Sequence, residues 1–191
     1  MSSKKLAIKK NPAIFLDRDG VINLPLIKED NRPYSPSSLD EFVFCEGIIE
    51  TIKAIKENEM GFLVIVVTNQ PDVARGLKQK ENIELIHQHI IKQTLVDKIY
   101  CCYHDNSDNC ECRKPKVGLF QEAQQKYSID FERSFMVGDR RNDMLAGRKL
   151  HLKNIFINYN YSETLPTTDE YDFIINKKVS TINMREILKF I

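Results

Sequence analysis

The sequence predicts a doubly wound, Rossmann-like α/β fold in which helices cover both faces of a parallel sheet. Short apolar runs of strand length alternate with segments of helical periodicity along the 191 residues. This alternation is typical of parallel sheets, because successive parallel strands are joined by helices that pack on the sheet. Four of the apolar runs lead into polar clusters, and ligands bind at the carboxyl ends of strands in such sheets. We therefore expect four separate chain segments to converge on one crevice.

Apolar composition identifies the strands, and apolar spacing identifies the helices. The first run, Ala13 to Leu16, stops at an acidic cluster, as a buried strand delivering acids to a loop does. The predicted strands are 13–16, 62–67, 99–103, 134–137, 154–157 and 172–175. The predicted helices are 48–59, 81–93, 118–127, 143–150 and 181–190. The stretch 24–39 contains three prolines and is predicted as a loop over the crevice. We expect one domain over 1–191, without a large cap domain.

Composition excludes several function classes. Hydrophobic residues make up 42% and charged residues 29% of the chain, which is ordinary for a globular protein. The net charge of +1 provides no general attraction to nucleic acid or to an anionic membrane. The start, Met1 to Lys10, lacks the apolar run of a secretory signal, and no segment is long enough to cross a bilayer. We expect a cytoplasmic monomer that binds a small anionic ligand at a local site.

Asp17 and Asp19 directly follow the first predicted strand, and their spacing allows two carboxylates to take different roles. The first can act as a nucleophile, and the second can act as a general acid and base. Taken alone, an Asp-x-Asp sequence is equally consistent with a turn or a helix start. Because neighbouring carboxylates repel each other, a hard cation such as Mg²⁺ is expected between them and a phosphate.

Further polar groups follow the later predicted strands. Asp139 supplies another oxygen ligand for the cation, while Thr68 and Lys114 supply hydrogen bonds and positive charge for phosphoryl oxygens. Each residue is unremarkable by itself. Their order along the chain, with Asp143 four residues after Asp139, is difficult to obtain from packing requirements. The pattern favours phosphoryl transfer, with Asp17, Asp19, Thr68 and Lys114 as the catalytic residues.

A second cluster has the composition of a metal site. Four of the five cysteines lie between Cys101 and Cys112, in a chain without a secretory signal. Four ligands suit tetrahedral Zn²⁺ in a structural site, and they are Cys102, His104, Cys110 and Cys112. Cys101 is one residue out of register and is not counted. The alternative is a group of free cysteines beside a surface histidine. A metal within 101–113 would hold the neighbouring Arg113 and Lys114 in place.

These motifs resemble those of a known superfamily. The segments are Asp17-Arg-Asp-Gly-Val-Ile-Asn23, Val67-Thr-Asn-Gln70, Cys112-Arg-Lys-Pro115 and Val137-Gly-Asp-Arg-Arg-Asn-Asp143. Together they resemble the four motifs of the haloacid dehalogenase superfamily, within about 13–150, and more narrowly its zinc-containing small-cap branch. The resemblance implies Asp17 as nucleophile, Asp19 as acid and base, and Thr68 and Lys114 as phosphate stabilisers. It also implies magnesium bound by Asp17, the Asp19 carbonyl and Asp139, with Asp143 in the outer shell.

The substrate is the least determined part of this prediction. Asn69, Gln70 and Arg113 are expected to contact it, since a guanidinium suits a second phosphate. The branch contains heptose bisphosphate and histidinol-phosphate phosphatases. The run 68–76 is nearer the heptose members, whereas the loop 23–39 departs from their shorter loop. The working hypothesis is removal of the 7-phosphate of D-glycero-D-manno-heptose 1,7-bisphosphate, with histidinol phosphate as the alternative. His87 and His89 are interpreted as surface or packing residues.

Overall fold

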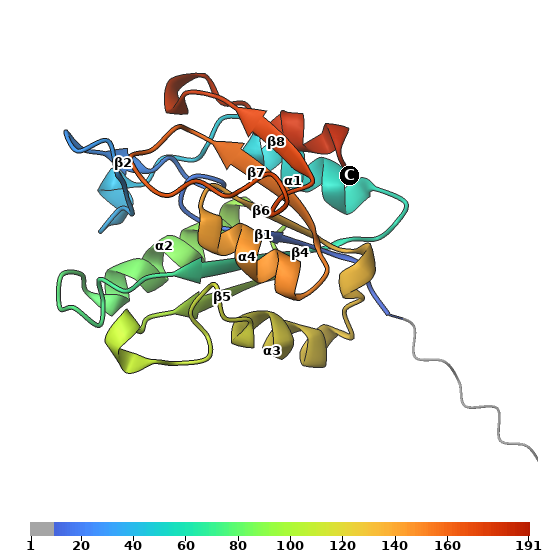
Figure 1. Cartoon of the computed structure of the whole chain (residues 1–191), viewed down its shortest axis with the longest axis horizontal. Coiled ribbons are helices and arrows are strands. Elements are labelled where there is room, and N and C mark those ends of the chain that lie inside the picture. Colours follow the sequence, from blue (N-terminus) through green and yellow to red (C-terminus); the bar gives the residue numbers. More distant parts are fainter. Residues whose placement is uncertain (1–9) are drawn as a thin grey trace, which may run out of the picture.

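A parallel sheet of six strands forms the centre of the molecule (Figure 1). The computed structural model describes residues 10–191. The prediction that the start, Met1 to Lys10, lacks a secretory signal therefore concerns a segment that lies almost entirely outside the described residues. The strand order is β5-β4-β1-β6-β7-β8. The strands are β1 (Ala13–Leu16), β4 (Leu63–Asn69), β5 (Lys98–Cys102), β6 (Phe135–Gly138), β7 (Lys153–Asn158) and β8 (Phe173–Asn176). The chain runs outward from β1 in both directions, which confirms the predicted doubly wound fold.

Alternating side chains of the strands build one apolar layer on each side of the sheet. Ile14 and Leu16 of β1 face a cluster that includes residues of α1 (Ile48–Glu57) and α2 (Lys80–Gln93). Ala13 and Phe15 face the opposite cluster, with residues of α3 (Gly118–Tyr127) and α4 (Arg141–Lys149). Each face of the sheet is therefore covered by two helices. Because both faces are buried, the central strands are apolar throughout instead of alternating with polar residues.

The register of the central strands brings the polar clusters together. Leu16, the last residue of β1, pairs with Val66 on one side and with Val137 on the other. The residues that follow these positions therefore meet at one edge of the sheet, as predicted. Strand β4 continues two residues further than expected, because Thr68 and Asn69 pair with β5. Both residues are consequently held within the sheet.

Two predicted segments differ in the structure. The segment 24–39 contains a small antiparallel hairpin, β2 (Leu26–Ile27) and β3 (Pro33–Tyr34). The predicted helix over 181–190 is wrong: the chain forms two 3₁₀ helices, η4 (Val179–Thr181) and η5 (Met184–Lys189). Ile182 between them has extended backbone, and the Asn183 side chain accepts a hydrogen bond from the Arg185 amide. This local bond competes with helix continuation.

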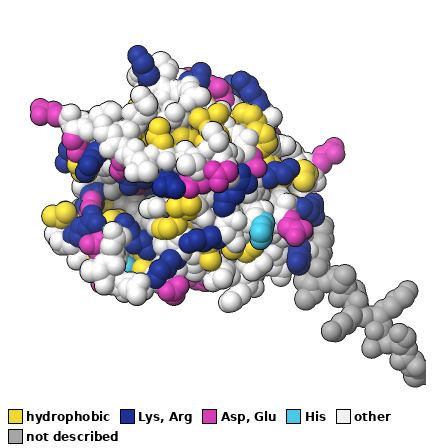
Figure 2. Space-filling model, in the orientation of Figure 1, with side chains coloured by type: hydrophobic (Ala, Val, Ile, Leu, Met, Phe, Trp, Pro, Cys, Tyr) yellow, Lys and Arg dark blue, Asp and Glu magenta, His cyan; other side chains and the backbone are white. Residues whose placement is uncertain are grey.

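Shorter 3₁₀ helices complete the fold: η1 (Leu39–Glu41), η2 (Asn106–Asp108) and η3 (Phe131–Arg133). On the face shown in Figure 2, basic and acidic side chains are interspersed, in keeping with the balanced composition. Within residues 10–191, none of the helices combines the length and the apolar character needed to pass through a bilayer.

Candidate active site

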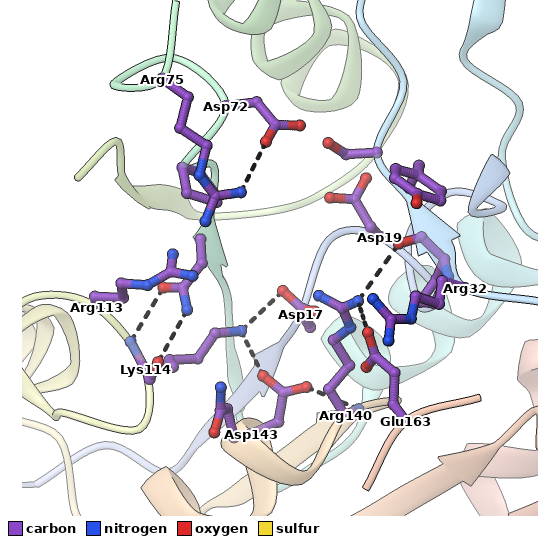
Figure 3. Close-up of a pocket in the computed structure, with 16 residues that line it drawn as sticks. Asp17, Asp19, Arg32, Asp72, Arg75, Arg113, Lys114, Arg140, Asp143 and Glu163 are labelled. Atoms are coloured by element: carbon purple, nitrogen blue, oxygen red, sulfur yellow. Dashed lines mark hydrogen bonds and ion pairs between the residues drawn. The ribbon is translucent and has the colours of Figure 1, made fainter. Parts of the chain in front are cut away.

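A cavity of about 320 Å³ opens at the carboxyl edge of β1, β4 and β6 (Figure 3). Its wall is strongly polar and carries charges of both signs. The charged lining residues are Asp17, Asp19, Arg32, Asp72, Arg75, Arg113, Lys114, Arg140, Asp143 and Glu163. The hairpin contributes Arg32 to Ser35, so the segment 24–39 forms part of the cavity wall, as expected from its position in the sequence.

Lys114 lies at the centre of the charged wall. Its ammonium donates to Asp17 Oδ1 at 2.8 Å and to the Val67 carbonyl at 2.7 Å, and it lies 2.6 Å from Asp143 Oδ1. Burial disfavours the charged form, but the carboxylates of Asp143 and Asp17 outweigh burial and raise the pKa of Lys114. The ammonium therefore stays charged in a site that excludes most water.

Three buried carboxylates converge beside this ammonium. Oxygen atoms of Asp17, Asp139 and Asp143 lie within 4.8 Å of one another. Burial, the larger effect, and the neighbouring acids raise the pKa of Asp17 to about 6 and that of Asp139 well above its ordinary value. Asp139 Oδ1 is buried and has no hydrogen-bond partner among the described residues. Three converging carboxylates, one of which has a buried oxygen without a partner, fit a hard divalent cation such as Mg²⁺.

A glycine makes room for this group. Gly20 has a φ of +84°, and a Cβ at this position would overlap the Asp139 carboxylate. The loop after β1 can therefore approach β6 closely only because residue 20 has no side chain.

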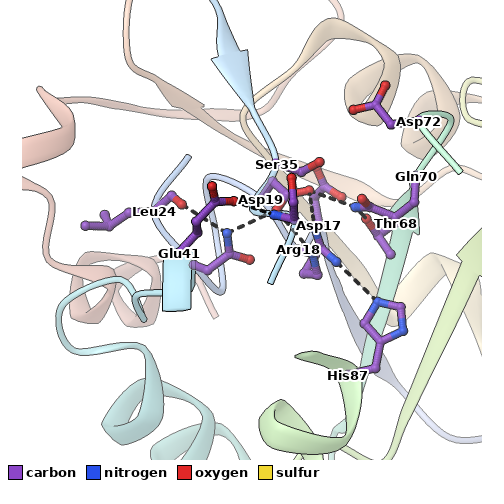
Figure 4. Close-up of polar contacts among 12 residues, drawn as sticks. Asp17, Arg18, Asp19, Leu24, Ser35, Glu41, Thr68, Gln70, Asp72 and His87 are labelled. Carbon is purple, nitrogen blue, oxygen red and sulfur yellow. Dashed lines mark hydrogen bonds and ion pairs between the residues drawn. The ribbon is translucent and has the colours of Figure 1, made fainter. Parts of the chain in front are cut away.

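Asp19 points toward a different set of partners (Figure 4). Arg18 donates to Asp19 Oδ1 at 2.8 Å, while Asn23 and Gln70 donate to its two oxygens at 3.0 and 2.8 Å. Burial opposes ionisation of Asp19, but the ion pair with Arg18 and these hydrogen bonds together lower its pKa. The side chain thus has a fixed orientation and is ionised in the absence of substrate.

Of the three residues after Val67, only Asn69 lines the cavity, and the other two are buried. Asn69 lines the cavity, and its amide exchanges two hydrogen bonds of 3.1 Å with the Lys114 backbone. Thr68 and Gln70 are both 1% exposed and lie beneath the cavity. Gln70 donates to Asp19 and to the Thr68 hydroxyl. Gln70, expected at the substrate, is therefore found supporting Asp19.

Sequence reasoning missed several residues of the cavity wall. Arg75 lines the cavity and pairs with Asp72 and with Asp105 at 2.6 Å. Arg140 pairs with Glu163 at 2.6 Å, and Glu163 lies far along the chain in a segment without a motif. The dense charge of 139–143 was the available signal for Arg140, and a position soon after the strand that ends at Asn69 was the signal for Arg75. Glu163 had none. Arg113, a predicted residue, lines the same cavity.

The predicted cysteine and histidine cluster is assembled beside the cavity. Donor atoms of Cys102, His104, Cys110 and Cys112 all lie within 4.8 Å of one another. The neighbouring sulfur–sulfur separations run from 3.0 to 3.6 Å. Donors of a tetrahedral zinc site with bonds of about 2.3 Å lie roughly 3.8 Å apart, so the cluster needs only slight expansion to hold the ion. The pairing of Asn69 with Lys114 links this loop to β4.

The fold and the site define a phosphatase of the haloacid dehalogenase type. The chain matches the family described as polynucleotide kinase 3 phosphatase over residues 17–179. A D-glycero-beta-D-manno-heptose-1,7-bisphosphate 7-phosphatase of Helicobacter pylori is 38% identical over 77% of this chain and 83% of the relative. The alpha-anomer enzyme of Campylobacter jejuni is 31% identical over 95% and 96%.

A solved structure shares the fold. The D,D-heptose 1,7-bisphosphate phosphatase of B. bronchiseptica, complexed with magnesium and phosphate, superposes with a TM-score of 0.72. It is 24% identical, and the match covers 94% of this chain and 99% of that one. The chain described here belongs to the polynucleotide kinase 3 phosphatase family, in the branch of the heptose bisphosphate phosphatases. The predicted superfamily is confirmed, and so is the predicted likeness to its heptose bisphosphate phosphatases.

Proposed function

We propose that the protein hydrolyses a phosphomonoester through a phosphorylated Asp17. The observation that carries the proposal is the arrangement of Asp17, Lys114 and Asp19 at one edge of the sheet. Asp17 Oδ attacks phosphorus, the bond from phosphorus to the leaving oxygen breaks, and Asp19 in its acid form gives that oxygen a proton. Asp19 then takes a proton from water as the water attacks phosphorus. The bond to Asp17 breaks, and inorganic phosphate is released.

The neighbouring side chains would stabilise the negative charge of the phosphoryl group and set the protonation states of the two catalytic aspartates. Lys114 lies next to Asp17 and would stabilise the phosphoryl oxygens. The same role for Thr68 requires its buried hydroxyl, which accepts from Gln70, to turn toward the phosphate. Asp17 has to be ionised to attack, and its ion pair with Lys114 favours that form. The approach of an anionic phosphate would favour the protonated form of Asp19, which the first step requires. Arg113, on the wall of the cavity, would bind a second anionic group of the substrate.

Two metals complete the proposal. Asp17, Asp139 and the Asp19 backbone carbonyl would hold Mg²⁺, with Asp143 close by. When bound, this ion supplies positive charge that offsets the carboxylates and the phosphate. Cys102, His104, Cys110 and Cys112 would hold a structural Zn²⁺, and this ion would rigidify the loop that leads to Arg113 and Lys114.

The proposed substrate is D-glycero-D-manno-heptose 1,7-bisphosphate, which would lose its 7-phosphate on the way to nucleotide-activated heptose. The names of the Helicobacter and Campylobacter relatives support the heptose, and they differ in the anomer. The several arginines on the cavity wall also suit a substrate with two phosphates. A cytoplasmic location, a monomeric state and the absence of nucleic-acid and membrane binding stay predictions.

The deciding experiment is phosphate release with Mg²⁺ from the alpha and beta anomers of heptose 1,7-bisphosphate and from histidinol phosphate. We expect selective turnover of one heptose anomer. Selective turnover of histidinol phosphate would move the protein to amino-acid synthesis. If none of the three is hydrolysed while p-nitrophenyl phosphate is, the phosphatase chemistry stands and the heptose assignment fails.

A further inference from the structure

A fully buried arginine stands directly behind the proposed acid and base. Arg18 lies between Asp17 and Asp19 in the sequence, and its guanidinium is 0% exposed. Nε and Nη2 donate to the Asp19 carboxylate at 3.1 and 2.8 Å. A guanidinium buried this deeply needs partners for its remaining N–H groups, because an unsatisfied charged group is costly in the interior.

The next partner of Arg18 is a histidine from a different element. His87 lies in the middle of α2, is 4% exposed, and places Nε2 at 3.4 Å from Arg18 Nη1 (Figure 4). A guanidinium has only donors, so the imidazole must accept through Nε2 and carry its proton on Nδ1. The His87 ring is therefore neutral, in agreement with burial and the Arg18 charge lowering its pKa to about 4.

An acidic side chain lies near the other nitrogen of the ring. Nδ1 of His87 faces Glu84 Oε2 at 3.8 Å, one turn earlier on α2. The other oxygen of Glu84 accepts a hydrogen bond from the Tyr103 hydroxyl. Tyr103 lies between Cys102 and His104, two members of the metal cluster. Polar side chains thus lie in series from the metal loop through α2 to Asp19, with a gap of 3.8 Å between His87 and Glu84.

We propose that His87 is a positioning residue for Asp19. By accepting from Arg18, His87 holds the long guanidinium side chain in one geometry, and the guanidinium holds the Asp19 carboxylate. The inference rests on the proposed role of Asp19 as acid and base. It assigns a function to a histidine that the sequence placed among surface or packing residues. A shift of about 1 Å in a reacting group can cost up to roughly 100-fold in rate, so a flexible Arg18 would impair proton transfer.

The test uses the leaving group as a readout. An alkoxide needs a proton from Asp19 to depart, whereas p-nitrophenolate leaves without one. The value of kcat/KM reports the steps up to phosphorylation of Asp17, so it depends on Asp19 only for the alkyl substrate. The two substrates are p-nitrophenyl phosphate and the sugar phosphate that the wild-type enzyme turns over fastest.

The variants are His87→Leu, His87→Gln and a matched control, His89→Leu. For His87→Leu we expect kcat/KM to fall about 10-fold on the sugar phosphate and to stay within about twofold on p-nitrophenyl phosphate. His87→Gln should recover most of the loss, because an amide oxygen can accept from Arg18. His89 lies on the same helix as His87 and stacks on Phe44, and its replacement should leave the ratio of the two values unchanged.

Two outcomes would overturn the inference. An equal fall on both substrates would mean a packing defect, and no change on either would mean that His87 is not needed. Asp17→Asn separates this result from the proposed function. If Asp17→Asn is inactive and the His87→Leu ratio matches wild type, only the positioning role is lost. If Asp17→Asn is active, the proposed mechanism itself fails.

Discussion

The ammonium of Lys114 lies 2.6 Å from Asp143 Oδ1, and both side chains are only 2% exposed. Asp143 also accepts a hydrogen bond from the Arg140 amide at the start of α4, through its other oxygen. One buried carboxylate thus connects the cation beside the nucleophile to the first turn of a helix. Asp143 thus belongs to the same charged group as Asp17 and Asp139, and its position in the outer shell of the metal stays a prediction.

Replacing Lys114 should destabilise the fold. Lys114→Met leaves Asp17, Asp139 and Asp143 buried together without their cation, which typically costs about 3–5 kcal/mol when one partner of a buried pair is removed. Added Mg²⁺ should restore part of the loss, since it binds the folded state. Urea unfolding with and without Mg²⁺ measures both effects. Lys53→Met, on the exposed face of α1, is the control. Equal stability of Lys114→Met and wild type would contradict the described charge balance.

Asp17→Asn should abolish turnover while preserving the fold. The amide has the size of the carboxylate but cannot form an acyl phosphate, so we expect kcat to fall at least about 1000-fold. Phosphate release gives the rate, and the far-ultraviolet circular dichroism spectrum should match wild type. Asp40→Asn changes an exposed aspartate and should retain activity. Activity of Asp17→Asn near that of wild type would remove Asp17 as the nucleophile.

Arg113→Met should discriminate between one and two phosphates. The buried Nη1 of Arg113 has no partner among residues 10–191, so the guanidinium can accept an anion. We expect KM for a sugar bisphosphate to rise about 10-fold, which is the effect of losing one charge-assisted contact. KM for p-nitrophenyl phosphate should change little. A parallel rise for both substrates would instead place Arg113 at the reacting phosphate.

Two adjacent cysteines provide the test for zinc. Purified protein should contain about one equivalent of zinc, and Cys102→Ser should lose it because Cys102 is one of the four clustered donors. Cys101→Ser should keep the metal, since its thiol is outside the cluster. Mass spectrometry of the metal content decides this directly. Chelation should also lower the melting temperature more than removal of Mg²⁺ does. Protein isolated without zinc would refute the metal assignment.

His87 should make stability depend on pH. Its pKa is about 4 in the folded protein and 6.5 when free, so between these values the unfolded state binds more protons. The contribution of His87 to stability should therefore rise with pH across this window and be lost as the pH falls, by roughly 2–4 kcal/mol in total. The raised pKa values of Asp17 and Asp139 act in the opposite direction in the same window. Arg18, Glu84 and Asp19 are the charged groups that face the ring.

Urea unfolding at several pH values between 4 and 7 measures this dependence. The difference between the wild-type and His87→Gln curves isolates the contribution of His87, because glutamine does not titrate, and this difference should grow as the pH rises from 4 to 6.5. His89→Gln, on the same helix, should keep the wild-type profile. A wild-type curve that His87→Gln leaves unaltered would show that the buried ring is not the titrating group.

The parts of the fold that the sequence predicted correctly are those with strong local signals. The run Ala13 to Leu16 is apolar because both faces of the sheet are covered, and this composition is visible without a structure. The segment 181–190 has helical spacing, but Asn183 bonds its own backbone there and two 3₁₀ helices result. The spacing of apolar residues alone does not reveal such a competing hydrogen bond.

The candidate site divides in the same way. Asp17 and Asp139 lie together because each directly follows an apolar strand, and β1 and β6 are neighbours in the sheet. The cluster of Cys102, His104, Cys110 and Cys112 could be predicted because its four ligands lie close together in the sequence. In contrast, Gln70 was expected at the substrate and instead supports Asp19 from beneath. Which way a side chain turns at the end of a strand depends on its neighbours in space.

The sequence by itself determined the fold class, the converging acids and the cysteine cluster, because strand composition and short-range spacing specify them. The tertiary structure alone decided which side chains became partners. Arg18 meets His87 across 69 positions of the chain, and Lys114 reaches Asp17 across 97. Contacts at such separations depend on how a helix or loop packs on the sheet, and on the need of each buried charge for a partner. Neither requirement leaves a pattern along the chain.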